Sequence, residues 1–256
     1  MSSPLRGQPS HTAEMVSQLL FGETYETIGE QAGWLKIRTA DCAYEGWLQR
    51  KQHTPISEAD HTAYLKTPRQ LVRTLFQFVR DAESHIPVPL CIGAQFPIPE
   101  NGFFTMAGHR YMVEQATMPP IPHHEGLTEQ QDQLLAFALQ YLNVPYLWGG
   151  RTPAGIDCSG FTQMVFRSIG INLPRDASQQ VEVGSPVDFA DEAQIGDMAF
   201  FGDEDGRITH VGIVCGHRQI IHSSGHVQIN TLDDTGIFQV SFGQYTHLLR
   251  IIKRLF

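Results

Sequence analysis

One cysteine of this chain lies where a protein would place a nucleophile. Asp157 precedes Cys158 and is a good helix N-cap residue, and an apolar run at helical spacing follows. Cys158 is therefore expected in the first turn of a helix, where free backbone N–H groups and the positive end of the helix dipole favour a thiolate over a thiol. The pattern predicts a cysteine nucleophile at this position.

Two histidines in predicted strands supply the base that such a nucleophile needs and a group to orient that base. Alternation places His210 on one face of the strand 208–214, and His222 lies on one face of the strand 219–222. In a hairpin symmetric about Gly216 the two histidines are directly opposite, with Cβ atoms roughly 4.5 to 5.5 Å apart. We expect one imidazole to orient the other.

Several polar and aromatic residues near Cys158 have two interpretations. Asp176 either caps a helix that begins at Ala177 or faces a ligand. Tyr146 and Trp148 are either core aromatics or residues that line a cleft. The histidine spacings match no metal site, so no metal and no other cofactor are expected. The remaining cysteines are expected to be unreactive thiols: Cys42, Cys91 and Cys215.

Composition excludes several classes of protein. The 256-residue chain has a formal net charge of -9, which provides no basic surface for a nucleic acid. Its four cysteines are widely spaced without a C-x-x-C pair, as suits a reducing compartment. Neither a signal peptide in the first ten residues nor an apolar run of about 18 residues is visible. We expect a cytoplasmic monomer with no membrane partner.

The pattern along the chain changes twice. Short alternating runs punctuated by glycine predict a small β-barrel over residues 1–54, and a second small β domain is expected over 55–118. A proline-rich stretch predicts a linker over 119–126.

The pattern of residues 127–256 predicts an α+β domain with two helices and several strands. The first helix begins with a capping box at Thr128 and Gln131, and the second runs from Asp157 to Gly170. The strands are expected at 198–201, 208–215, 219–222, 227–230 and 247–252.

Six separated motifs resemble the NlpC/P60 cysteine peptidases over about residues 125 to 256. They are Y-L-W-G-G at 146–150, D-C-S-G-F at 157–161, L-P-R-D at 173–176, G-D at 196–197, H-V-G-I at 210–213, and His222. The resemblance implies a papain-like core that hydrolyses amide bonds in bacterial cell-wall peptides. It implies Cys158 as the nucleophile, His210 as the general base and His222 as its orienting residue. Backbone N–H groups at the helix start, with the Tyr146 hydroxyl, would face the developing oxyanion.

The amino-terminal third resembles a bacterial SH3-like (SH3b) domain at residues 17–23, 34–37 and 41–48. Two SH3b-like barrels before an NlpC/P60 domain form a layout similar to that of γ-D-glutamyl-L-diamino acid endopeptidases. In those enzymes the first barrel roofs the active site, so that only peptides with a free N-terminal L-Ala fit. The resemblance implies that Tyr44 and Asp176 hold the substrate ammonium, with Glu14 as a weaker candidate. It adds other substrate-binding residues: Tyr146, Trp148, Asp157 and Ser159.

The expected fold is therefore α+β, a papain-like NlpC/P60 catalytic domain preceded by two small SH3-like β-barrels. The expected partner is a murein peptide. Two alternatives to this function remain open at this point. One is a wall-binding module whose SH3b domains tether it to peptidoglycan and whose catalytic residues are incidental. The other is an amidase or acyltransferase that uses the same thiolate, or an enzyme whose SH3b domains bind intact peptidoglycan and which acts on the wall as an amidase or DL-endopeptidase.

Overall fold

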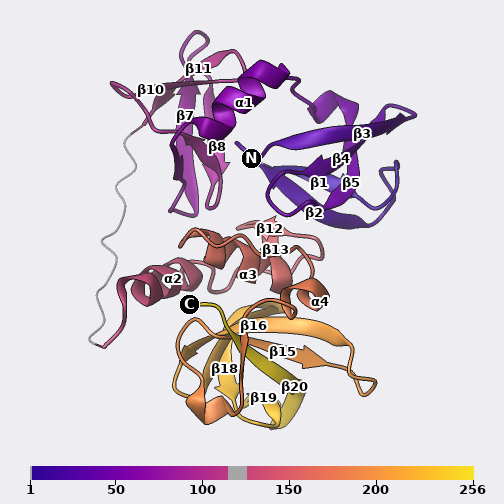
Figure 1. Ribbon diagram of the computed structural model, residues 1–256, viewed down its shortest axis with the longest axis vertical. Coiled ribbons are helices and arrows are strands. Elements are labelled where there is room, and N and C mark those ends of the chain that lie inside the picture. The colour runs from indigo at the N-terminus through magenta and orange to yellow at the C-terminus, as the bar shows by residue number, and fades with distance from the viewer. Residues whose placement is uncertain (1, 115–125) are drawn as a thin grey trace. The chain divides into compact units, whose positions relative to one another are not determined.

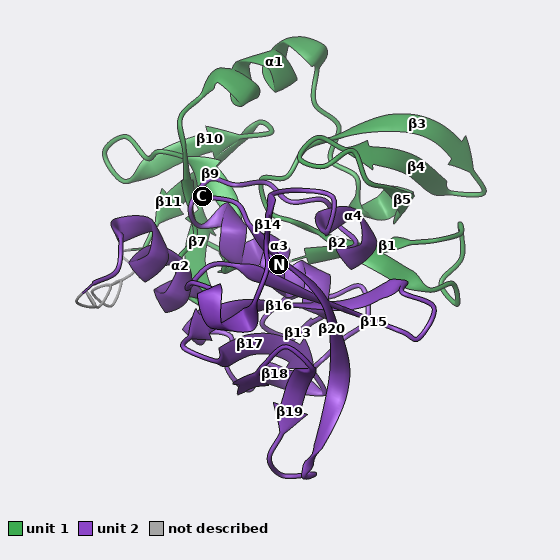
Figure 2. Cartoon of the chain, turned by 60° about the horizontal axis from the view of Figure 1, so that its bottom comes forward, with its two compact units in different colours: residues 1–119 green, residues 120–256 purple. Residues whose placement is uncertain are grey.

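The computed structural model describes residues 2–114 and 126–256, and the chain forms two compact units, residues 1–119 and 120–256 (Figure 2). The linker expected over residues 119–126 lies almost entirely outside the described residues. No helix among the described residues combines the length and the apolar character needed to cross a membrane.

A five-stranded antiparallel sheet begins the first unit, with strand order β2-β1-β5-β4-β3 (Figure 1). Its strands lie within residues 1–54, where short alternating runs punctuated by glycine predict a small β-barrel. The apolar side chains of one face form a core that includes Leu5, Ile37 and Leu48. The strands are β1 (Ser2–Arg6), β2 (Met15–Leu20), β3 (Tyr25–Gln31), β4 (Trp34–Thr39) and β5 (Glu45–Gln49), followed by the 3₁₀ helix η1 (Arg50–Gln52).

A second β module completes the first unit. Helix α1 (Glu58–Lys66) opens it, and the Ser57 side chain caps this helix by accepting a hydrogen bond from the Asp60 N–H. A four-stranded sheet of order β10-β11-β7-β8 and a two-stranded sheet of β6 and β9 follow. The strands are β6 (Arg69–Leu71), β7 (Phe76–Asp81), β8 (Pro87–Cys91), β9 (Gln95–Pro97), β10 (Phe103–Met106) and β11 (His109–Val113).

The two modules of the first unit join at Phe21 and Gly22. The Phe21 ring makes edge contacts with Phe104 and Tyr111, whose cluster forms the core of the second module. The Phe21 carbonyl accepts from the Gln95 N–H at 2.9 Å, and the Gly22 carbonyl accepts from the Tyr64 hydroxyl at 2.7 Å. Phe21 of the first module therefore contributes to the core of the second module.

The second unit begins with helices. The expected capping box is present, because Thr128 accepts from the Gln131 N–H while the Gln131 side chain accepts from the Thr128 N–H. Helix α3 follows a short β12–β13 ladder and precedes the one-turn helix α4. The elements are α2 (Glu129–Leu139), β12 (Arg151–Thr152), β13 (Gly155–Ile156), α3 (Cys158–Arg167), α4 (Ala177–Gln180) and the 3₁₀ helix η2 (Ala190–Glu192).

A seven-stranded antiparallel sheet forms the rest of the second unit, in the order β14-β20-β15-β16-β17-β18-β19. The long strand β20 pairs with β15 along one edge and with β14 and β19 along the other, so the sheet closes on itself around an apolar core. The strands are β14 (Ser185–Val187), β15 (Met198–Gly202), β16 (Ile208–Gly216), β17 (Gln219–Ser224), β18 (His226–Leu232), β19 (Gly236–Gln239) and β20 (Gln244–Arg254).

The register expected for the β16–β17 hairpin is wrong. His222 pairs with Gly212 rather than with His210, and the turn consists of His217 and Arg218 rather than being centred on Gly216. The ladder is interrupted between Val214 and Gly216, where Cys215 forms a bulge that adds one residue to β16. His210 and His222 consequently lie diagonally across the hairpin, still on the same face of the sheet.

Candidate active site

Cys158 is the first residue of helix α3, as expected. The Asp157 side chain caps the helix and accepts a hydrogen bond from the Gly160 N–H at 2.6 Å. Helix α3 packs against β16 and β17, the strands that carry the two histidines. Only 7% of the Cys158 surface is exposed. The fold therefore brings a capped helix start with a cysteine to the strands that hold the imidazoles.

The two histidines form a buried, hydrogen-bonded pair. His210 Nε2 and His222 Nδ1 are 2.8 Å apart, and the rings are nearly perpendicular, at 85°. His222 is 1% exposed, and its Nε2 is 2.8 Å from Asn230 Oδ1 on β18. Burial lowers the pKa of His210 well below 6.5 and the pKa of His222 to about 4, so both imidazoles are neutral at pH 7.

A third histidine lies against this pair. The ring of His247, on β20, is 4.2 Å from the His210 ring between centroids and tilted by 31°. It also approaches the His222 ring edge-on, at 5.6 Å. Burial lowers the pKa of His247 as well, and its charged form would lower the pKa of His210 further. Three imidazoles from three strands thus share one end of the sheet.

The thiol of Cys158 does not have the low pKa that a helix start favours. Burial, followed by the Asp157 carboxylate, raises its pKa from 9.0 to about 11. The N–H groups of Val211 and Ser159 and the Arg175 guanidinium act in the opposite direction and are outweighed. Burial therefore favours the neutral thiol and the neutral imidazoles, against the direction that the helix start favours.

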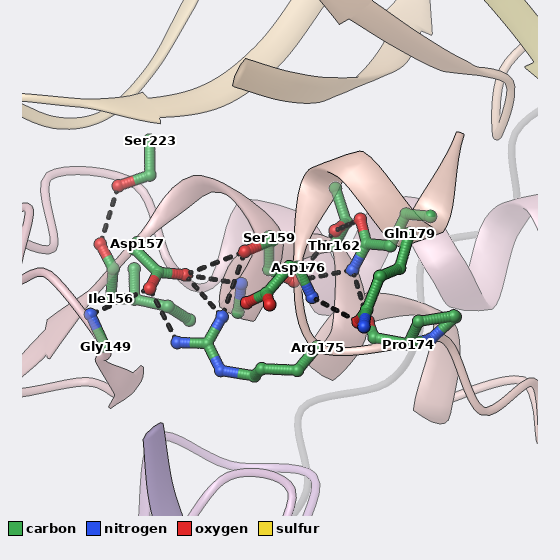
Figure 3. A network of polar contacts seen from close by, with 12 residues as sticks. Gly149, Ile156, Asp157, Ser159, Thr162, Pro174, Arg175, Asp176, Gln179 and Ser223 are labelled. Atoms are coloured by element: carbon green, nitrogen blue, oxygen red, sulfur yellow. Dashed lines mark hydrogen bonds and ion pairs between the residues drawn. The ribbon is translucent and has the colours of Figure 1, made fainter. Parts of the chain in front are cut away.

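A buried ion pair anchors the start of helix α3 (Figure 3). Arg175 donates to both Asp157 oxygens, at 3.1 and 2.6 Å, and to Ser159 Oγ at 2.9 Å. The Gly149 N–H donates to Asp157 Oδ2 at 2.8 Å. Asp157 therefore joins the 146–150 loop, helix α3 and the segment before α4, and its carboxylate is satisfied by protein donors.

The aromatic residues of the Y-L-W-G-G motif differ in their surroundings. Tyr146 is half-buried, and burial together with the Cys158 and Asp157 charges raises the pKa of its hydroxyl, which therefore stays protonated. Trp148 is 61% exposed and is not a core residue. The Tyr146 N–H donates to the Gly225 carbonyl at 2.9 Å, which ties this loop to the β17–β18 turn.

The remaining predicted substrate-binding residues are distributed over both units. Ser159 is buried in the Asp157–Arg175 network, and half-buried Asp176 precedes helix α4. Tyr44 is half-buried in the loop before β5, and exposed Glu14 precedes β2, both in the first unit. The structure therefore brings Cys158, His210, His222, Asp157 and Ser159 into one region of the second unit, with Tyr146 beside them.

Sequence reasoning missed three residues of this region. Arg175 lies in the P-R-D segment, where the residue pattern indicates a role only for its neighbour Asp176. Asn230 was recognised only as the end of a strand, although it is on the strand that pairs with β17. No local pattern distinguishes His247, because its approach to His210 depends on the pairing of β20 with distant strands.

Comparison with known proteins agrees with this architecture. The model of the NlpC/P60 family matches residues 143–245, and that of the bacterial dipeptidyl-peptidase SH3 domain matches residues 5–52. The chain belongs to the NlpC/P60 family. The gamma-D-glutamyl-L-lysine dipeptidyl-peptidase of Bacillus subtilis strain 168 is 31% identical to it over 236 residues, which are 86% of this chain and 76% of that protein.

Two further matches extend over most of this NlpC/P60 protein. Dipeptidyl-peptidase 6 of Lysinibacillus sphaericus is 29% identical over 262 residues, covering 91% of this chain and 90% of the relative. The crystal structure of an NlpC/P60 family protein from Bacillus cereus ATCC 10987 superposes with a TM-score of 0.76 at 22% identity, over 94% of this chain and 82% of the other. The chain is a cysteine peptidase with an SH3 domain, as its motifs predict.

Proposed function

We propose that this protein hydrolyses the γ-D-glutamyl–diamino acid amide bond of murein peptides that carry a free N-terminal L-Ala. The observation that carries the proposal is Cys158 at the capped start of α3, packed on the strands of the hydrogen-bonded His210–His222 pair. The name of the relative from Bacillus subtilis, gamma-D-glutamyl-L-lysine dipeptidyl-peptidase, supports the same bond, and the relative from Lysinibacillus sphaericus is named as a dipeptidyl-peptidase.

In the first step, His210 takes the thiol proton as Cys158 Sγ attacks the carbonyl carbon of the scissile amide. Burial raises the pKa of this thiol to about 11. Proton transfer to His210 and attack by Sγ would therefore occur together, so that the thiolate forms only as it attacks. The negative charge that develops on the carbonyl oxygen would be met by backbone N–H groups at the start of α3 and by the protonated Tyr146 hydroxyl.

In the second step, the protonated His210 gives its proton to the departing amine of the diamino acid, and a thioester with Cys158 remains. His210 then activates a water molecule that attacks this thioester and releases L-Ala-γ-D-Glu. His222 holds the His210 ring throughout, through the 2.8 Å contact between Nε2 and Nδ1.

The free L-Ala terminus is the finer part of the proposal. A substrate ammonium that leaves water needs carboxylates and lone pairs, and Asp176 and Tyr44 carry these groups in the family motifs, with Glu14 as a weaker candidate. Trp148, exposed beside the Asp157–Ser159 network, would contact the peptide. Asp157 and Ser159 both accept hydrogen bonds from Arg175, so we propose that they hold the start of α3 in place rather than contact the substrate.

We also propose a papain-like arrangement for the second unit and an SH3-like origin for the second β module. Soluble wall fragments in the cytoplasm are the proposed source of the peptide, during peptidoglycan turnover or recycling. The wide spacing of the four cysteines, without a C-x-x-C pair, supports a reducing compartment.

A panel of synthetic peptides tests the function. We expect mass spectrometry to show release of L-Ala-γ-D-Glu from L-Ala-γ-D-Glu-L-Lys or its diaminopimelate counterpart. Cys158→Ala should abolish turnover without unfolding the chain, and retained turnover would remove the nucleophile assignment.

The same panel with N-acetylated peptides tests the free terminus. The full chain should refuse the blocked peptides, and Tyr44→Phe and Asp176→Asn should raise KM for the free ones. Equal rates on free and blocked peptides would contradict this specificity. Cleavage of intact peptidoglycan at a higher rate than soluble peptides would favour an enzyme that acts on the wall.

A further inference from the structure

Three polar side chains from three adjacent strands form a continuous hydrogen-bonded chain. His210 on β16 contacts His222 on β17, and His222 contacts Asn230 on β18, with both heavy-atom distances at 2.8 Å. Asn230 lies opposite Ile220, two residues from His222, so all three side chains share one face of the sheet. Asn230 is the last side chain of this hydrogen-bonded series.

The chemical type of the Asn230 atom decides where the protons lie. A carbonyl oxygen such as Oδ1 only accepts, so His222 Nε2 must carry a hydrogen and donate it. Neutral His222 then has a bare Nδ1 that accepts from His210, and His210 must carry its hydrogen on Nε2. This leaves His210 Nδ1 as the nitrogen with a free lone pair, which is the atom that a general base needs.

The opposite arrangement would disable the base. If the terminal group donated to His222 Nε2, the hydrogens of both imidazoles would move to Nδ1, and His210 would have no free lone pair on that nitrogen. A single acceptor at the far end of the chain thus determines the protonation pattern of the imidazole that is two hydrogen bonds away. An acceptor at Asn230 also agrees with the two effects on the pKa of His222. Burial lowers this pKa most, and the hydrogen bond to Asn230 raises it by a smaller amount.

We propose that Asn230 is a positioning residue that sets the tautomers of His222 and His210 and keeps His210 Nδ1 free to take the Cys158 proton. The proposal rests on the proposed function for its kinetic consequence, whereas the tautomers themselves are independent of turnover. A neutral acceptor suits this role, since an amide orients His222 without adding a charge to the buried pair.

The titratable groups that act on the pair come from several elements. His247 on β20 lies against both rings, His226 at the start of β18 acts on His222, and Cys158 lies at the start of α3. The role of Asn230 is therefore tested by comparing variants at this one position, so that the other titratable groups stay the same.

Nuclear magnetic resonance of ¹⁵N-histidine-labelled full-length protein tests the tautomers directly. We expect wild-type His210 and His222 to show protonated Nε2 and bare Nδ1 at pH 7. Asn230→Leu, which has a similar shape and no acceptor, should shift both residues toward a mixture of tautomers. Protonated Nδ1 on either histidine of the wild type would overturn the proposal without any variant.

Kinetics with the murein tripeptide supply the second readout. We expect Asn230→Leu to lower kcat about 10- to 100-fold with little change in KM, as when the group that orients a catalytic histidine is lost. Asn230→Asp keeps an acceptor and should restore most of kcat, while its charge moves the acid limb of the pH profile to higher pH. Thr231→Ala, at the neighbouring exposed residue of β18, is the control and should behave as wild type.

The two failures are distinguishable. An Asn230→Leu protein with wild-type kcat and wild-type tautomers overturns the role of Asn230. A wild-type protein that shows the expected tautomers but cleaves no murein peptide refutes the proposed function and leaves the orientation of the histidine pair confirmed.

Discussion

At the scale of single residues, two groups of neighbours shift the pKa of the Cys158 thiol in opposite directions. The helix start favours the thiolate, as residue types alone indicate, and the N–H groups of Val211 and Ser159 act in the same direction. Burial and the neighbouring Asp157 carboxylate favour the thiol and prevail. Burial also lowers the pKa of His210, so we expect the proton to pass from cysteine to histidine during the reaction.

The alkylation rate of Cys158 should therefore depend steeply on pH. A pKa of about 11 leaves about 10⁻⁴ of the thiol ionised at pH 7, and this fraction rises about tenfold per pH unit up to the pKa. We expect the rate constant for iodoacetamide, measured by mass spectrometry of the Cys158 peptide, to follow this slope between pH 7 and 10.

Cys158→Ser provides the background from the other three cysteines in the same experiment. A rate that stays constant from pH 6 to 9 would contradict the expectation, because it would show a thiolate–imidazolium pair already present in the free enzyme.

At the scale of elements, the β16–β17 hairpin sets the geometry of the histidine pair. The bulge at Cys215 shifts the ladder so that His222 faces Gly212. A Cβ atom on Gly212 would lie 2.8 Å from His222 Cβ and 2.7 Å from Ile220 Cδ1, closer than carbon atoms approach in proteins. The absence of a side chain at this position lets His222 sit deep enough to reach both His210 and Asn230.

Gly212→Ala should consequently displace His222 and lower kcat about 100-fold, since a shift of about 1 Å in a catalytic group has an effect of this size. The pH dependence of Cys158 alkylation should change little, which separates a local displacement from unfolding. Gly29→Ala is a matched control, because its Cβ would meet nothing closer than Lys36 Cβ at 3.6 Å. Wild-type kcat in Gly212→Ala would show that His222 needs no such space.

The same hairpin shows what residue patterns can and cannot predict. Alternation placed His210 and His222 on one face correctly, because the period of a strand is a local property. It missed the bulge, because nothing in the residues around Cys215 distinguishes a bulged ladder from a regular one. The N-caps Asp157 and Thr128 were recognised from adjacent residues, whereas the Arg175 ion pair and the His247 stack join segments that are distant in the chain.

At the scale of the whole molecule, the first unit depends on a close contact between its two β modules. Gly22 has a φ of +85°, and a Cβ on it would lie 1.8 Å from the Gln95 carbonyl oxygen. The backbone of one module can therefore approach β9 of the other only without a side chain here. Phe21, next to it, contributes its ring to the core of the second module.

We expect Gly22→Ala to destabilise the first unit by about 3 kcal/mol, from a strained φ and the clash with Gln95 together. Gly33→Ala is the control, because Gly33 has a similar φ of +81° and no atom within 4 Å of its Cβ. This control should cost only about 1 kcal/mol. Hydrogen exchange on peptides from each module measures both effects, and equal losses in the two variants would refute the contact.

The closure of the second unit's sheet also bears on how the protein behaves at high concentration. An open sheet edge presents unpaired N–H and C=O groups that can recruit a strand from another molecule and start aggregation. Because β19 pairs with β20, the closed part of this sheet has few unpaired positions among the described strands, and β14 lies outside it as an edge strand of three residues with Pro186 at its centre. Proline has no N–H to offer a neighbour, so the edge of β14 is a poor template for fibril growth.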